Sequence, residues 1–154
     1  MMFKFRLRSK TQFESKLYDE KKFYEAFVAD LKHASKSIVI ESPFICYRRV
    51  AYLLPDIVRA LDRGISIQII TRNPNEHDQF MRAQAKSIVD TFRNMGVDVH
   101  YVRKTHLKIA MIDKQILWEG SLNILSQSNS RELMRRIVSL KECKIMKKFI
   151  SVER

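Results

Sequence analysis

The sequence predicts an α/β fold: a single domain with a mixed, largely parallel sheet flanked by helices. The chain has 154 residues, the size of one ordinary domain that spans residues 1–154. It contains only three glycines and three prolines, and no repeat or low-complexity tract marks a linker. Short apolar runs alternate with longer amphipathic segments, which is the strand and helix order of a layered α/β fold.

The first half of the chain supplies the first elements of this pattern. Residues 3–8 alternate apolar and basic side chains, as a strand with one buried face does. Phe23, Phe27 and Leu31 recur at four-residue spacing and predict an amphipathic helix over 19–34. The run S-I-V-I-E at 37–41 predicts a short buried strand. Apolar residues at helical spacing predict a further helix over 49–63, which Gly64 ends.

The second half continues the alternation of strands and helices and then predicts two strands in succession. Residues 65–70 and 97–102 read as strands, and residues 78–95 between them read as a helix followed by Gly96. The runs 107–112 and 115–118 flank Asp113 and Lys114, which is the separation of a tight hairpin. Asp-Lys is weaker turn chemistry than Asn-Gly. We therefore expect a hairpin to follow the strand and helix units.

The charge balance points to an anionic partner. Lysine and arginine number 29 against 17 acidic residues, a formal charge of +12, and the isoelectric point is near 9.9. Such a chain attracts polyanions, and nucleic acid fits best. A basic surface that serves only solubility is the alternative. An anionic membrane surface is a third explanation, although no long amphipathic basic helix supports it.

The sequence lacks the signals that mark several other classes of protein. Cys46 and Cys143 lie outside any C-x-x-C spacing, so neither a disulfide scaffold nor a zinc site is expected. His33, His77 and His100 have no partners at metal-ligand spacings, and no Walker lysine appears. We expect no metal, no cofactor and no ATP site. No secretory signal and no apolar run of about 20 residues is present, so a cytoplasmic protein is the default expectation.

One run carries chemistry: H-L-K-I-A-M-I-D-K-Q-I-L-W-E-G-S-L-N, from His106 to Asn123. Residues two apart in a strand face the same side, so His106 and Lys108 project together. The imidazole can attack phosphorus while the ammonium neutralises non-bridging oxygens. Gly120 permits close backbone approach, and Ser121 and Asn123 can donate hydrogen bonds to phosphate. Such groups are useful to an anionic phosphodiester, although a histidine and a lysine in this spacing, taken alone, also fit a basic strand edge.

This run resembles the HKD signature of the phospholipase D superfamily, in the G-S-x-N form of many nuclease members. The similarity extends to I-V-I-E-S-P-F-I at 38–45, to R-G-I at 63–65, to I-T-R at 70–72 and to S-R-E-L-M-R-R, so it covers most of 35–137. The chain looks like HKD nuclease domains found alone or attached to helicase-like ATPases. The resemblance implies a phospholipase D-like fold, phosphate contacts by His106, Lys108 and Asn123, and a structural role for Asp113. A turn-capping aspartate would look the same.

Other residues are candidates with two interpretations each. The resemblance gives Glu132 the role of orienting His106, whereas a glutamate in the first turn of a helix would be equally ordinary. Phe44 and Tyr47, with Arg48 and Arg49 after them, form either a stacking and phosphate-binding wall or core and solvated residues. Trp118 reads as core rather than as a base-stacking platform. Further phosphate-contact candidates are Arg72, Arg103, Lys104, Arg135 and Arg136.

Superfamily catalysis uses two HKD motifs, and this chain holds one. The resemblance therefore implies a homodimer in which both subunits complete one site. The leading hypothesis is a metal-independent phosphodiesterase that cleaves DNA, or RNA, through a phosphohistidine. If it is coupled to a helicase-like ATPase, that ATPase acts in trans. The alternatives are a catalytically silent nucleic-acid-binding accessory module of a repair or restriction assembly and, less favoured, a phospholipid hydrolase.

Overall fold

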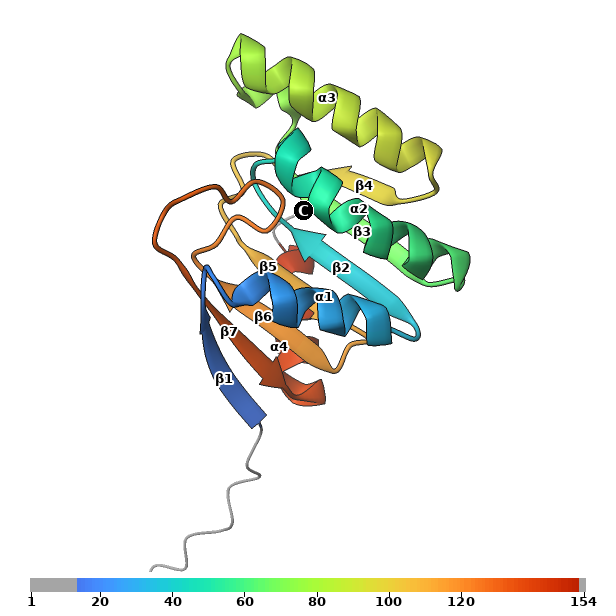
Figure 1. Ribbon diagram of the computed structural model, residues 1–154, viewed down its shortest axis with the longest axis vertical. Helices are drawn as coiled ribbons and strands as arrows, with labels where there is room; N and C mark the ends of the chain where they lie inside the picture. Colours follow the sequence, from blue (N-terminus) through green and yellow to red (C-terminus); the bar gives the residue numbers. More distant parts are fainter. Residues whose placement is uncertain (1–13, 153–154) are drawn as a thin grey trace, which may run out of the picture.

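The computed structural model describes residues 14–152, which form one seven-stranded sheet with helices on both faces (Figure 1). The strands are β1 (Glu14–Asp19), β2 (Ser37–Glu41), β3 (Ser66–Thr71), β4 (Asp98–Tyr101), β5 (Ile109–Ile112), β6 (Ile116–Gly120) and β7 (Leu133–Val138). The helices are α1 (Phe23–His33), α2 (Tyr47–Asp62), α3 (Gln79–Asn94) and α4 (Leu140–Val152), with a 3-10 turn, η1, at Pro74–Glu76. The strand expected at 3–8 lies outside the described residues.

The sheet is mixed, as expected, but less parallel than the sequence predicts. Its strand order is β1-β7-β6-β5-β2-β3-β4. Only β2 with β3 and β3 with β4 pair in parallel, and the other four pairings are antiparallel. A three-residue connection such as the one between β5 and β6 permits only antiparallel pairing, since a parallel pair needs a long crossover. The parallel half is therefore limited to the strand and helix units between β2 and β4.

Two apolar clusters bury the two faces of the sheet. Helices α1, α2 and α3 cover one face, and α4 lies on the other (Figure 1). The larger cluster contains Phe23 and Phe27 of α1, which pack against the fully buried Trp118 of β6. Trp118 is thus core, as the sequence predicts. No helix within the described range is long and apolar enough to cross a membrane.

Two predicted element boundaries need correction. The first helix begins at Phe23 rather than at Asp19, because β1 ends at Asp19 and the Asp19 carboxylate accepts hydrogen bonds from the amides of Lys21 and Lys22. The strand expected at 107–112 begins only at Ile109. Three elements, the strands β1 and β7 and the helix α4, were not predicted. Their polar residues interrupt the apolar periodicity, and pairing of β7 with β1 and β6 decides the two strands.

The expected hairpin joins β5 and β6. Asp113 and Lys114 both have positive φ, +55° and +57°, as the central residues of a type I′ turn do. Asp113 tolerates this conformation, and its carboxylate accepts the backbone amides of Ser35, Lys36 and Ser37 at 2.7–3.1 Å. Partial burial acts to raise its pKa, but these hydrogen bonds outweigh it and lower the pKa. Asp113 therefore fastens the hairpin to the start of β2.

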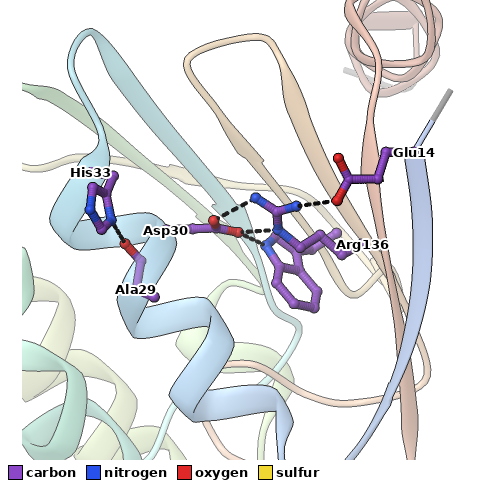
Figure 2. Close-up of polar contacts among 6 residues, drawn as sticks. Glu14, Ala29, Asp30, His33 and Arg136 are labelled. Atoms are coloured by element: carbon purple, nitrogen blue, oxygen red, sulfur yellow. Dashed lines mark hydrogen bonds and ion pairs between the residues drawn. The ribbon is translucent and has the colours of Figure 1, made fainter.

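An ion pair connects α1 to the sheet (Figure 2). The Asp30 carboxylate accepts Nε and Nη2 of Arg136, each at 2.8 Å, and Nε1 of Trp118 at 2.8 Å. Glu14 of β1 lies 3.9 Å from Arg136. The hydrogen bonds that Asp30 accepts raise the pKa of Arg136, so the guanidinium stays protonated. Arg136 was predicted to contact phosphate, but it pairs with Asp30 in this cluster of Asp30, Arg136 and Trp118.

Candidate active site

His106 and Lys108 lie on the segment that leads into β5. The amide of Gly120 donates to the carbonyl of Lys108 at 3.3 Å, which continues the β5 and β6 pairing toward the histidine. Lys108 is nearly buried at 9% exposure, whereas His106 is exposed. The Lys108 ammonium donates to the carbonyl of His106 at 2.7 Å. The two residues are thus held beside each other, with the imidazole toward solvent.

The environment of Lys108 joins three segments of the chain. Burial lowers the pKa of Lys108, the Glu132 carboxylate acts in the opposite direction, and the Arg72 guanidinium lowers it further. Glu132 precedes β7, and Arg72 follows β3. The Glu132 carboxylate and the Arg72 guanidinium are therefore each within electrostatic reach of the Lys108 ammonium. A cationic centre with one nearby carboxylate suits an anionic phosphodiester.

Gly120 and Ser121 bring β6 against the start of β7. A Cβ atom at Gly120 would lie 2.2 Å from the carbonyl oxygen of Leu133 and 2.9 Å from the Cα atom of Met134, so only glycine fits. The amide of Ser121 donates to the Leu133 carbonyl at 3.0 Å, and the Leu133 amide donates to Ser121 Oγ at 3.1 Å. The hydroxyl keeps its own hydrogen, which it can donate to a phosphate.

Asn123 begins a loop that α1 and α2 hold in place. Tyr24 Oη donates to the carbonyl of Ile124 at 2.9 Å, and the Cys46 amide donates to the carbonyl of Leu125 at 3.0 Å. Among the residues that the structure describes, Asn123 Oδ1 is the one buried side-chain nitrogen or oxygen without a hydrogen-bond partner. Such an atom costs free energy in the protein alone. Asn123 Oδ1 can be completed only by a hydrogen-bond donor, whereas Nδ2 of the same amide is the group that can donate to a phosphate oxygen.

Glu132 is not a helix residue, so that interpretation was wrong. It lies in the connection that enters β7. Its Oε1 accepts Ser130 Oγ at 2.8 Å, and Gln127 Nε2 donates to Ser130 Oγ at 3.1 Å. Within 14–152 no hydrogen bond joins Glu132 to His106, so an orienting role for Glu132 stays a prediction. Its neighbour in this structure is Lys108.

Two adjoining grooves collect the motif residues. One, of about 470 Å³, is lined by His106, Lys108 and Gly120 together with Arg135 and Met146. The other is lined by Ser121 and Glu132. Leu17 of β1 and Leu133 of β7 border both grooves. The grooves therefore bring together predicted residues from three separate segments, whereas Asn123 and Asp113 line neither groove.

The predicted phosphate-binding arginines divide into distinct groups. Arg49 is structural, because its guanidinium lies 3.8 Å from the Tyr24 ring centroid and donates Nε and Nη2 to the Gln127 carbonyl. Arg72 stays beside Lys108, and its Nε donates to the carbonyl of Thr105. Arg103 lines a different groove, with Asn73, Glu76 and Tyr101. Lys104 is exposed beside it, Arg48 is exposed at the start of α2, and Arg135 lines the His106 groove.

The stacking wall expected after β2 stays a prediction. Phe44 is half-buried; its ring centroid lies 5.3 Å from that of His77, in a tilted arrangement, and 5.1 Å from the Arg72 guanidinium. Tyr47 is 54% exposed.

Across 14–152 no group of three or more His, Cys, Asp or Glu side chains is arranged to hold a metal ion. Cys46 and Cys143 are both free thiols, and burial raises the pKa of Cys143 to about 11.

Sequence reasoning missed the residues that hold the site loop. Tyr24, Gln127 and Ser130 act through hydrogen bonds that join segments up to 100 residues apart in the chain. The only local signal was the polar run S-Q-S-N-S after the motif, which is typical of a loop with internal hydrogen bonds. Spacing within one segment does not show which distant helix such a loop contacts.

Comparison with known proteins agrees with the motif. A family model described as cardiolipin synthase, PLD-like domain, matches residues 27–151. Among solved structures, NucT from Helicobacter pylori is similar with a TM-score of 0.72 and 19% identity, covering 92% of this chain and 96% of that one. Nuc from Salmonella typhimurium, a phospholipase D family member, gives 0.74 and 13%, covering 92% and 94%.

A third similar structure is TrmBL2, an archaeal chromatin protein. Its TM-score is 0.64 at 16% identity, and the match covers 94% of this chain and 53% of that protein. No curated protein matches the sequence. At these identities the structural matches show the fold, and the family model adds the sequence relationship over most of the chain. The chain therefore belongs to the phospholipase D superfamily, as a single α/β domain of the PLD-like type.

Proposed function

We propose that the protein is a metal-independent phosphodiesterase that cleaves nucleic acid, DNA by preference, in a site shared by two subunits. The observation that carries the proposal is the meeting of His106, Lys108 and Gly120 in one groove, with Ser121 and Glu132 in the adjoining one. The fold and family are those of phosphodiesterases. The formal charge of +12 favours a polyanionic substrate over a neutral one.

The chemistry follows from the groups in the grooves. A ring nitrogen of His106 attacks phosphorus, a P–N bond forms, and the P–O bond to the leaving oxygen breaks. His106 of the partner subunit donates the proton that this oxygen takes up. Water, deprotonated by the same partner histidine, then hydrolyses the phosphohistidine and restores His106. Lys108, Ser121 and Asn123 stabilise the charge on the non-bridging oxygens throughout.

An exposed apolar strip beside the site supports the dimer. Leu17 and Leu133 lie on adjacent strands and are 54% and 52% exposed. Both border the groove of His106, to which Met146 of α4 also contributes. Ile145 and Phe149 on α4 are exposed to a similar extent, at 53% and 51%. A second copy that covers this strip would bring its own His106 toward the first.

The catalytic part is tested by cleavage of plasmid and single-stranded DNA in excess EDTA. We expect cleavage by the wild type and none by His106→Ala. His33→Ala is the matched control, because His33 lies on α1 with its Nδ1 at 2.7 Å from the carbonyl oxygen of Ala29 (Figure 2), and it lines neither groove. Activity that appears only with an added divalent metal, or that survives in His106→Ala, would overturn the proposal.

The dimer is tested by sedimentation at micromolar protein concentration. Leu133→Glu places a charge in the strip and should give an inactive monomer. Leu140→Glu is the control, since Leu140 is also 52% exposed but lies beyond the other end of β7. It should remain dimeric and active. A wild-type monomer with full activity would contradict the shared site.

A second candidate is a nucleic-acid-binding module without turnover. The likeness to TrmBL2, an archaeal chromatin protein with a novel mode of DNA binding, favours it. Binding and cleavage measured on the same DNA separate the two functions. Tight binding with no cleavage in any buffer, unchanged by His106→Ala, would support the binding module. The three motif side chains His106, Lys108 and Asn123 are all retained, which favours the enzyme.

A further inference from the structure

The segment that carries His106 belongs to no helix or strand. Residues 102–108 connect β4 to β5, and Lys104 within them has a positive φ of +55°. The side chain of His106 is exposed, so its position is set mainly through its backbone. A segment without a regular ladder needs other hydrogen bonds to hold it. Those bonds converge on the preceding residue, Thr105.

The side chain of Thr105 ties this segment to β2. Thr105 is 7% exposed, and its hydroxyl donates to the carboxylate of Glu41, the last residue of β2. Glu41 is itself only 3% exposed. The amide of Leu107 donates back to Thr105 Oγ1 at 3.4 Å. One hydroxyl therefore connects a buried strand end to the residues on both sides of the histidine.

The main chain of the same segment is held from β3. Arg72, the residue after β3, donates Nε to the carbonyl of Thr105 at 2.7 Å. Its guanidinium lies 5.1 Å from the Phe44 ring centroid. On the other side of the histidine, Lys108 Nζ donates to the carbonyl of His106 at 2.7 Å. The peptide groups before and after His106 thus each have a charged donor.

We propose that Thr105 is a positioning residue for the nucleophile. It fixes the backbone of His106 to the ends of β2 and β3 through Glu41 and Arg72. This role rests on the proposed phosphodiesterase function and adds to it a residue outside the HKD motif. A misplacement of about 1 Å at a reacting group can cost about 100-fold in rate. The Thr105 hydroxyl is the contact whose removal should cause such a displacement without altering any group that touches phosphate.

The test compares Thr105→Val, which keeps the branched shape without the hydroxyl, with Thr105→Ser, which keeps the hydroxyl. We expect Thr105→Val to lower kcat about 10- to 100-fold while KM changes by less than about threefold, and Thr105→Ser to recover most of the rate. Thr71→Val is the matched control. Thr71 is 2% exposed, and its hydroxyl donates at 3.4 Å to the carbonyl of Pro43 rather than to the histidine segment. It should leave kcat near that of the wild type.

Amide hydrogen exchange gives a readout that does not depend on activity. In Thr105→Val the Leu107 amide loses its acceptor and should exchange faster, whereas Thr71→Val should leave it unchanged. If Thr105→Val does not fold, Thr105→Ala makes the same deletion with a smaller side chain. An active wild type whose Thr105→Val variant keeps its kcat would overturn this role alone. An inactive wild type would overturn the proposed function, and the role of Thr105 with it.

Discussion

Polar side chains are paired differently in two regions of the molecule. One is the cluster of Asp30, Arg136 and Trp118, and the other is the pair of grooves beside His106. In the cluster, the Asp30 carboxylate receives three donors from Arg136 and Trp118, all at 2.8 Å (Figure 2). In the motif region, Asn123 Oδ1 is buried without a partner, and burial lowers the pKa of Lys108, which lines the His106 groove. The first arrangement completes its own hydrogen bonds, whereas the second leaves an acceptor unpaired and a lysine partly desolvated.

We propose that this difference separates the basic residues that serve stability from those that serve binding. Arg49 and Arg136 are both paired within the protein, and they hold a loop and a helix in place. Lys108 borders a groove, and burial lowers its pKa, which means that its charged form is disfavoured there. A lysine with a purely structural role would not need to be placed in such an environment. A substitution in the cluster should therefore reduce stability and spare the chemistry, and a substitution in the grooves should do the reverse.

Among the substitutions that test this comparison, the largest change in kcat is expected for Asn123→Ala. Asn123→Ala removes a hydrogen-bond donor to the non-bridging oxygens, so kcat should fall about 100-fold. The melting temperature should stay the same or rise, because a buried atom without a partner is removed. Steady-state kinetics and thermal unfolding on the same preparation check both parts. A lower melting temperature with a normal kcat would show that Asn123 is structural.

Asp30→Asn tests the other side of the comparison. It leaves the Arg136 guanidinium with an uncharged partner, which should lower the free energy of unfolding by about 2–3 kcal/mol. Chemical denaturation measures this loss. The activity per folded molecule should remain close to that of the wild type. An Asp30→Asn protein with normal stability and impaired cleavage would place the ion pair in the active machinery.

A smaller effect is expected at Asp113, the aspartate of the motif. Asp113→Asn weakens the hydrogen bonds from the amides of residues 35–37 and should cost about 1–2 kcal/mol of stability. The pKa of Asp113 is lowered on folding, so its contribution is present above its ordinary value of 3.8 and is lost as the pH falls through the folded value. The difference in stability between wild type and variant should therefore shrink in acid. A kcat loss at full stability would instead make Asp113 part of the chemistry.

The subtlest effect is on the alkaline side of the rate profile. In the proposed mechanism protonated Lys108 is the active form, and its lowered pKa means that activity should decline at a lower pH than for an ordinary lysine at 10.5. The Glu132 carboxylate opposes this shift, so Glu132→Gln should move the decline to still lower pH. Rate measurements in overlapping buffers check the direction. A shift toward higher pH would show that Glu132 acts on another group.

The fold was predictable where periodicity is local. The strand at 37–41 matches β2 in full, and the helix at 49–63 differs from α2 by only two residues at its start and one at its end. Strand β7 was missed because Leu133–Val138 contains two adjacent arginines, one of which is neutralised by Asp30 far away in the sequence. The sheet was thus expected to be more parallel than it is.

The motif residues were predictable from fixed spacing, whereas their supports were not. His106, Lys108 and Gly120 recur at offsets that the chemistry needs, and they meet in one groove. Arg49 and Arg136 were expected to contact phosphate because a basic side chain looks the same in sequence whether it pairs with protein or with ligand. Thr105 has no sequence signal, since its partners Glu41 and Arg72 come from other strands.

The most direct measurement is covalent trapping of the phosphorylated enzyme. Wild-type protein is mixed in EDTA with an oligonucleotide that carries a radiolabelled internal phosphate, quenched in alkali during turnover, and digested. The proposed function predicts a label that is stable to base, labile to acid and located on the peptide that contains His106. Cleavage without any labelled protein, or equal labelling in His106→Ala, would contradict it.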